Sequence, residues 1–295
     1  MEPNEYLKTI LGKQSLGNDS PEVLAMARER HAVETLLRDR YGDSPKIRYG
    51  GSRAKGTMVR ESYDLDIICY FGHEDNDAGD SLEAIYNDVR KCLESKYAVQ
   101  PKTSALRLQK RDDRTDFHID VVPGRFVDGD GGDAFLYQAA GPEKRLKTNL
   151  QVHIDHIRNS GLIDEVKLVK LWNIRWGLGL KTFILELLVI KLLKGARAKG
   201  LADRLVNLWE QLKDNANDLS VEDPANPTGN DLSEILNEKM KRTLSSLASR
   251  TLNSIEQQGW ESVFGPAKEV SDQEKVAAIE VLTSRRPAAP KLWCP

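Results

Sequence analysis

Cysteine is scarce in this chain. Its 295 residues include only three, Cys69, Cys92 and Cys294, and no two of them form a CxxC pair. This usage indicates reduced thiols, and it argues against both a disulfide framework and a structural zinc site. A long apolar run is also missing, and residues 1–5 lack the basic start and apolar core of a signal peptide. We therefore expect a cytoplasmic protein without a membrane partner.

Neither sign of charge is in large excess. Lysine and arginine number 43 against 45 aspartates and glutamates, which leaves a net charge of −2. Obligate nucleic-acid binders present a basic field to the phosphate backbone, so we predict no obligate nucleic-acid partner. The length is sufficient to bury a substantial core and to form two lobes.

The most informative segment covers residues 50–57, Gly-Gly-Ser-Arg-Ala-Lys-Gly-Thr. A short strand is predicted over residues 47–49, and the glycines after it allow a tight turn that can bring N–H groups and the Ser52 hydroxyl close to a triphosphate. Lys55 would add a positive charge there. The Gly-Lys-Ser/Thr order of a Walker loop is absent, so this cradle belongs to another class of phosphate site.

Two carboxylates follow the cradle at alternate positions. Asp64 and Asp66 interrupt an otherwise apolar stretch, residues 64–70, that fits a buried strand. Side chains two residues apart on a strand share one face, and adjacent carboxylates repel unless a cation neutralises them. Hard oxygen ligands at this spacing predict two Mg²⁺ ions bridged to substrate phosphates, with Mn²⁺ as a substitute.

A third acid is needed if one of these ions is also to activate an attacking hydroxyl. Asp120 is the best candidate because it lies within the apolar run 117–122, where a lone carboxylate needs a partner or a metal. Asp116 alternates onto the same face and is the second choice. A Gly-Gly-Ser turn or an Asp-x-Asp pair alone is usually a plain turn or a solvated loop, but the cradle, the paired acids and the later acid together favour a functional site.

The segment from residue 50 to residue 70 resembles the signature of the polymerase-β-like nucleotidyltransferase superfamily. It most resembles the branch of oligoadenylate synthetase and cyclic GMP-AMP synthase, which includes the bacterial CD-NTases. Three later segments resemble the same branch, and they are Leu-Val-Lys-Leu-Trp at 168–172, Thr-Phe-Ile-Leu-Glu-Leu-Leu at 182–188 and Asp-Pro-Ala-Asn-Pro-Thr-Gly-Asn at 223–230. The resemblance extends over roughly residues 47–235.

The resemblance implies roles for the catalytic residues. Gly51 and Ser52 would hold the donor triphosphate, Asp64 and Asp66 would bind both metal ions, and Asp120 would bind one ion and the acceptor hydroxyl.

It also implies roles for four residues around the nucleotide. Lys55 and Lys170 would contact phosphates, Thr182 would approach a base edge, and Phe183 would stack on the base where the family more often has tyrosine. Taken without the resemblance, Lys170 is more simply a solvated helix residue and Phe183 a core aromatic. His153 and His156 share a helix face but have no further ligand cluster, so we expect surface or packing roles for them.

The fold class implied is α+β. We expect a polymerase-β-like nucleotidyltransferase lobe with a mixed sheet over residues 1–145, a C-terminal helical lobe over 146–284, a flexible tail over 285–295, and the active site in the cleft between the lobes. The expected helices cover residues 20–41, 80–95, 164–176, 181–194, 201–215, 232–258 and 271–283, and further strands cover 97–100, 105–108 and 117–122.

These features predict a Mg²⁺-dependent nucleotidyltransferase that makes a cyclic di- or trinucleotide second messenger from NTPs, with ATP among them. The resemblance adds a downstream cyclic-nucleotide effector and a role in bacterial antiphage defence. Two alternatives stay open. One is a template-independent linear polymerase, of the oligoadenylate synthetase or CCA-adding kind, and the other is a non-catalytic nucleotide-binding signalling partner.

Overall fold

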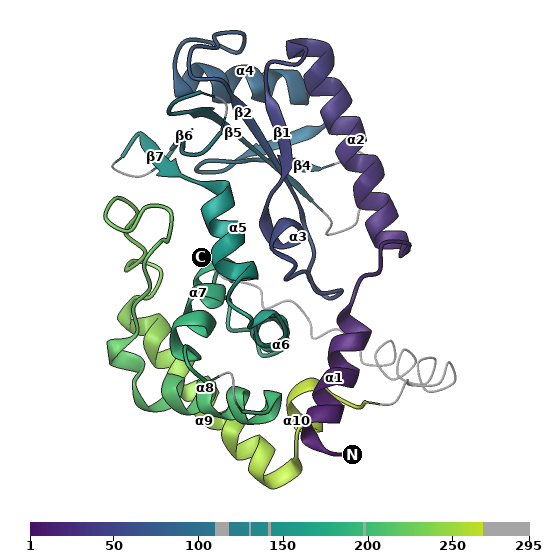
Figure 1. Ribbon diagram of the computed structural model, residues 1–295, viewed down its shortest axis with the longest axis vertical. Helices are drawn as coiled ribbons and strands as arrows, with labels where there is room; N and C mark the ends of the chain where they lie inside the picture. The colour runs from purple at the N-terminus through teal and green to yellow at the C-terminus, as the bar shows by residue number, and fades with distance from the viewer. Residues whose placement is uncertain (110–117, 130, 141–142, 197–198, 268–295) are drawn as a thin grey trace, which may run out of the picture.

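The computed structural model describes residues 1–109, 118–129, 131–140, 143–196 and 199–267 (Figure 1). A β-sheet flanked by helices forms one end of the molecule, and a group of helices forms the other. The predicted last helix, the tail and the alternative acid Asp116 lie outside the described residues. Among the described helices, none combines the length and the apolar character needed to cross a bilayer.

The sheet is mixed, as the sequence predicts. It has seven strands, in the order β1-β2-β5-β4-β3, with β6 attached to β5 and β7 to β6. Among the strands of the described residues, only β2 and β5 run parallel, and every other neighbouring pair is antiparallel. The strands are β1 (Lys46–Tyr49), β2 (Leu65–Phe71), β3 (Ala98–Pro101), β4 (Leu106–Gln109), β5 (Ile119–Phe126), β6 (Ala134–Tyr137) and β7 (Arg145–Thr148).

Two long strands form the centre of this sheet. β2 is buried at all positions but one, and β5 alternates between buried and half-buried residues. Their apolar side chains pack against α2 (Pro21–Tyr41) and α4 (Leu82–Glu94) in one continuous core. The pairing places the polar positions of both strands at one end of the sheet, next to the short helix α3 (Gly51–Lys55).

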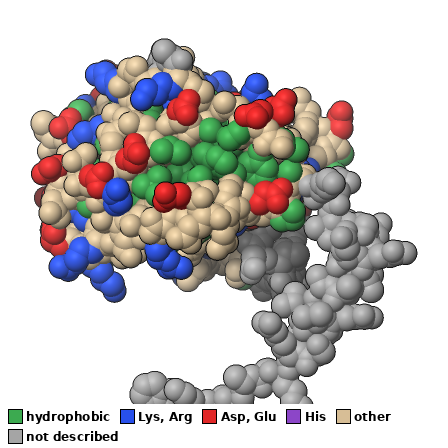
Figure 2. All heavy atoms as spheres, turned by 90° about the horizontal axis from the view of Figure 1, so that it is seen from below, with side chains coloured by type: hydrophobic (Ala, Val, Ile, Leu, Met, Phe, Trp, Pro, Cys, Tyr) green, Lys and Arg blue, Asp and Glu red, His purple; other side chains and the backbone are tan. Residues whose placement is uncertain are grey.

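The second lobe is helical and has its own core. Trp172 and Trp209, both fully buried, lie near its centre with their ring centroids 6.0 Å apart. The N-terminal helix α1 (Pro3–Gln14) also packs into this core, although the sheet follows it in the chain. The other helices of this lobe are α5 (Leu150–Arg158), α6 (Ile163–Arg175), α7 (Thr182–Leu192), α8 (Leu201–Asp214), the 3-10 turn η1 (Ala216–Asp218), α9 (Glu238–Gln258) and α10 (Glu261–Phe264). Seen from below, apolar side chains gather on the surface among charged ones (Figure 2).

Local sequence signals explain several helix ends. The Ser20 side chain accepts a hydrogen bond from the Val23 N–H, and Gly42 ends α2 with φ +60°, as a Ser-Pro start and a glycine stop predict. The predicted helix 232–258 is too long by six residues at its start. α9 begins only at Glu238, because Asn237 caps it by accepting from the Met240 N–H.

Candidate active site

Asp66 and Asp120 lie directly opposite each other on the parallel strands β2 and β5. Asp64 precedes β2 by one residue, and its carboxylate lies 3.2 Å from Nε2 of His118. The sequence places the two acids of β2 on one face, and the strand pairing brings the third acid beside them. All three predicted catalytic carboxylates therefore lie at the same end of the sheet.

The phosphate cradle is packed onto this acid pair. The N–H of Gly50 donates to the Asp66 carbonyl at 2.9 Å, which fixes the turn to the strand. Gly51 has φ +50°, and a Cβ built there would lie 1.5 Å from Oδ2 of Asp66. Only glycine therefore fits this position, for both its conformation and its space.

The carboxylates are held together at an electrostatic cost. Burial, together with the charges of Asp120 and Asp64, raises the pKa of Asp66 to about 6. Burial also raises the pKa of Asp64, although the nearby charge of His118 opposes the shift. The carboxylate oxygens of the three acids are the type of ligand that Mg²⁺ prefers. Their arrangement in this structure does not yet form a metal site, since the described residues contain no group of three or more His, Cys, Asp or Glu side chains that could hold an ion.

Arg107 is an element of the site that sequence reasoning missed. It lies opposite Asp120 on the antiparallel strand β4, and its Nε and Nη2 donate to the two carboxylate oxygens at 2.9 and 2.8 Å. The hydrogen bonds that it donates to Asp120 raise the pKa of the guanidinium above its ordinary value. A basic residue inside the apolar run 105–108 was the available signal, but only the pairing of β4 with β5 shows which acid it meets.

The two predicted phosphate lysines lie in one buried network. Nζ of Lys55 is 2.5 Å from Oε2 of Glu186, whose other oxygen accepts from the Thr57 hydroxyl at 2.6 Å. Nζ of Lys170 donates to the Thr57 carbonyl at 2.8 Å, and burial lowers the pKa of this ammonium to about 8. Glu186, which is fully buried on α7, is the second residue whose role the sequence alone does not predict. The network joins the cradle to the helical lobe.

The predicted base-binding residues are at the start of α7. Thr182 is its first residue and is exposed, while Phe183 is half-buried. The Phe183 ring has the Lys55 ammonium 5.5 Å from its centroid and the His153 ring at 4.8 Å. A surface or packing role is what we expect of His153 from the sequence, and its ring does pack against Phe183, beside the candidate nucleotide site.

His153 also forms a hydrogen bond with Asp223, which lies in the segment 223–230 that resembles the CD-NTase branch. Its Nε2 lies 2.6 Å from Oδ1 of Asp223, a residue that is only 1% exposed. The same carboxylate accepts from the Ala225 N–H at 2.8 Å and from Nδ2 of Asn230 at 2.6 Å. Burial tends to raise the pKa of Asp223, but the hydrogen bonds from His153 and Asn230 outweigh it and leave the pKa below its usual value.

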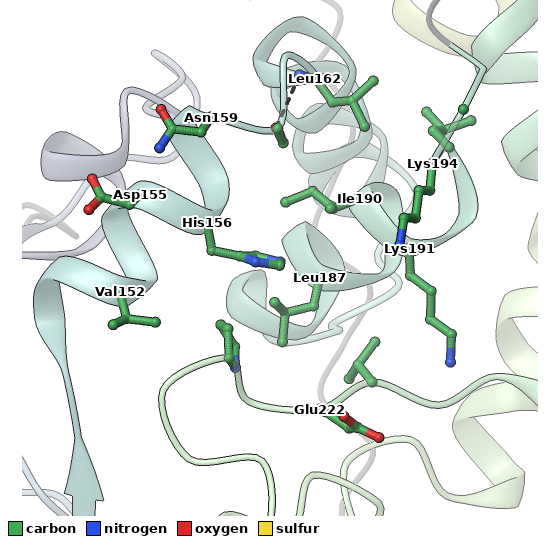
Figure 3. A pocket seen from close by; sticks show the side chains of 15 residues that line it. Val152, Asp155, His156, Asn159, Leu162, Leu187, Ile190, Lys191, Lys194 and Glu222 are labelled. Carbon is green, nitrogen blue, oxygen red and sulfur yellow. Dashed lines mark hydrogen bonds between the residues drawn. The ribbon is translucent and has the colours of Figure 1, made fainter.

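A cavity of about 1360 Å³ lies beside α5 and α7 (Figure 3). Its walls come from α5, from the second half of α7 and from Val221, Glu222 and Pro224. His156 and Val152 line it, whereas His153 and Phe183 do not. Within α5, His153 is therefore not part of the cavity wall that Val152 and His156 help to form.

The described fold is that of the CD-NTase nucleotidyltransferases. No family model matches the sequence, and none of the curated proteins does. Among solved structures, Escherichia coli MS115-1 CdnC, determined in complex with HORMA-deltaN, matches with a TM-score of 0.67 and 18% identity over 90% of this chain and 98% of that one. CdnG from Bradyrhizobium diazoefficiens, in complex with GTP, matches with a TM-score of 0.66 and 17% identity over 96% and 99%.

The cyclic AMP-GMP synthase DncV from Vibrio cholerae is similar as well, with a TM-score of 0.58 and 14% identity over 90% of this chain and 85% of that one. These likenesses cover nearly the whole of each chain, so both the sheet and the helical lobe belong to the shared fold.

Proposed function

We propose that this protein is a metal-dependent nucleotidyltransferase that joins nucleoside triphosphates into a cyclic di- or trinucleotide. The observation that carries the proposal is the register of β2 and β5, which sets Asp66 opposite Asp120 while Gly51 packs directly on the Asp66 carboxylate. A phosphate cradle in contact with paired acids is the arrangement that nucleotidyl transfer needs, because the donor triphosphate and its counterions must meet at one point.

Each group has a role in this reaction. The Gly51 backbone and Ser52 hold the donor triphosphate. Asp64 and Asp66 would hold two Mg²⁺ or Mn²⁺ ions, and Asp120 would hold one of them together with the acceptor hydroxyl. When bound, these ions would neutralise the carboxylates, favour ionisation of the attacking hydroxyl and stabilise the departing pyrophosphate. A ribose hydroxyl near Asp120 attacks the α-phosphate of the NTP, and a second transfer closes the ring.

The residues of the helical lobe bind the rest of the substrates. Thr182 and Phe183 hold a base at the start of α7, and Lys55 and Lys170 contribute positive charge below the cradle. ATP is among the substrates. The cyclic product acts as a second messenger on a downstream effector in bacterial antiphage defence, a role that rests on the resemblance to CD-NTases.

The proposal is tested by incubating the purified protein with all four NTPs and Mg²⁺ or Mn²⁺, followed by phosphatase treatment and mass spectrometry. A phosphatase-resistant product at the mass of a cyclic di- or trinucleotide, absent with Asp66→Asn, supports the proposal. Linear oligomers would identify a template-independent polymerase instead. Nucleotide binding without pyrophosphate release, under every metal condition, would indicate a non-catalytic binding protein.

A further inference from the structure

We propose that His153 is a specificity-determining residue, which accepts a hydrogen bond from the exocyclic amine of a purine nucleotide stacked at Phe183. The inference rests on the proposed function, because it assigns a base to the same nucleotide site. It names the substrate class as aminopurine nucleotides, adenine or guanine, which it favours over purines without an exocyclic amine.

The tautomer of His153 follows from its partner. The Asp223 carboxylate already accepts from the Ala225 N–H and from Asn230, and its pKa lies below the usual value, so it is ionised and can only accept. Nε2 of His153, 2.6 Å away, must therefore carry a proton and donate it. In the neutral imidazole the other nitrogen, Nδ1, is then an acceptor.

Nδ1 is available for a ligand. It has no hydrogen-bond partner among the described residues. It is also not one of the buried side-chain atoms without a partner in those residues, so Nδ1 itself is not fully buried. The side chain as a whole is 19% exposed. A fixed acceptor on a partly exposed ring can thus be reached from outside the protein.

The direction of this exposure is set by the neighbours of His153. The cavity of Figure 3 is lined by Val152, Asp155 and His156 from the same helix but not by His153. The imidazole instead lies 4.8 Å from the ring of Phe183, which has the Lys55 ammonium of the cradle helix on it. The accessible nitrogen therefore belongs to the nucleotide side of α5.

A fixed acceptor selects among bases by their hydrogen-bond donors. The exocyclic amine of adenine or guanine can donate to Nδ1, whereas hypoxanthine carries no amine and presents a carbonyl where adenine has one. Discrimination of this kind depends on a polar group that is held in place. Asp223 holds the edge of the His153 ring by a hydrogen bond, and Phe183 packs against the ring.

The test compares ATP, GTP and ITP, since inosine lacks the amine of both other purines but stacks in the same way. Dissociation constants are measured by calorimetry on the full chain with Ca²⁺, a hard cation of the same charge as Mg²⁺. We expect the wild type to bind ATP or GTP about 3- to 10-fold more tightly than ITP, the size of one hydrogen bond. His153→Gln, which keeps a donor for Asp223, should bring this ratio close to one.

The matched control is His156→Gln, which alters the histidine one turn later that faces the cavity and should keep the wild-type ratio. A merely structural role of His153 would weaken all three nucleotides equally and leave the ratio unchanged, which would overturn the inference. Equal binding of all three by the wild type would overturn it too and leave the proposed function standing. Failure to bind any NTP would instead overturn the proposed function.

A second measurement does not depend on the variant folding. The chain has five histidines, and the imidazole nitrogen signals of the wild type can be assigned by substituting the other four. The Nδ1 resonance of His153 should shift when ATP or GTP binds and stay in place with ITP. The same shift with all three nucleotides would contradict a contact with the amine.

Discussion

Arg107 and Asp120 face each other across β4 and β5 and share two hydrogen bonds, of 2.9 and 2.8 Å. In this structure both oxygens of the third acid accept from a guanidinium. A metal ion that binds Asp120 must displace at least one of these hydrogen bonds. Arg107 is therefore the counterion of Asp120 in this structure, and under the proposed function it would compete with a metal ion for this carboxylate.

Removing this counterion should strengthen metal binding. We expect Arg107→Gln to raise the affinity for Mn²⁺ about 3- to 10-fold, because the competing charge is gone and the acids keep their repulsion. The measurement is titration of Mn²⁺ followed by electron paramagnetic resonance. Arg40→Gln is the control, since it removes an equal charge from an exposed pair with Asp88 on the far side of the sheet lobe. An unchanged Mn²⁺ affinity in Arg107→Gln would mean that Asp120 is not a metal ligand.

Gly51 should tolerate no side chain. We expect Gly51→Ala to abolish pyrophosphate release, since its Cβ would take the space of the Asp66 carboxylate. Gly177→Ala is the matched control, because its φ of +63° imposes a similar backbone strain while its Cβ would meet nothing within 4 Å. That variant should lose about 1 kcal/mol of stability and keep activity. Retained activity in Gly51→Ala would argue against the cradle's contact with the acid pair.

Asp66 should lower the stability of protein stripped of metal by EDTA. Its pKa of about 6 in the folded state lies above the ordinary value of 3.8, so the folded state binds the proton more tightly. The free energy of unfolding therefore falls as pH rises from about 4 to about 6. At pH 7.5, Asp66→Asn should be more stable than the wild type by up to about 3 kcal/mol, and at pH 3.5 the gain should vanish.

Urea unfolding of both proteins at the two pH values measures this difference. Addition of Mg²⁺ and NTP should then stabilise the wild type and leave Asp66→Asn unchanged, because only the carboxylate gains from the cation. A stability gain that is the same at both pH values would show that ionising Asp66 in its buried place beside Asp120 and Asp64 carries no cost.

Glu186 should be essential to the junction between the lobes. Glu186→Gln removes the charge that is 2.5 Å from Lys55 in a fully buried position, and we expect it to lower the free energy of unfolding by about 3–5 kcal/mol. Glu94→Gln provides the contrast. Its ion pair with Arg90 is 40% exposed on each side, and its loss should cost less than about 1 kcal/mol. Equal, small effects in chemical unfolding would show that the buried network carries no stability.

Local chemistry is what the sequence alone determined. The glycines of the cradle, the alternation of Asp64 and Asp66 and the cap residues of α2 are properties of neighbouring residues, so their consequences can be derived without a partner strand. The mixed sheet with a helical lobe, and most helix bounds, follow from periodicity and from the resemblance to CD-NTases. The start of α9 was misplaced because apolar residues before Asn237 continue the helical pattern without continuing the helix.

Contacts between distant segments were decided only by the tertiary structure. Arg107 meets Asp120 because β4 pairs with β5 in one register, and a shift by one residue would turn the side chain to the other face. Glu186 reaches Lys55 across 131 positions of the chain, and His153 reaches Asp223 across 70. Such contacts depend on how helices and strands pack in space, and no local pattern of the sequence records that packing.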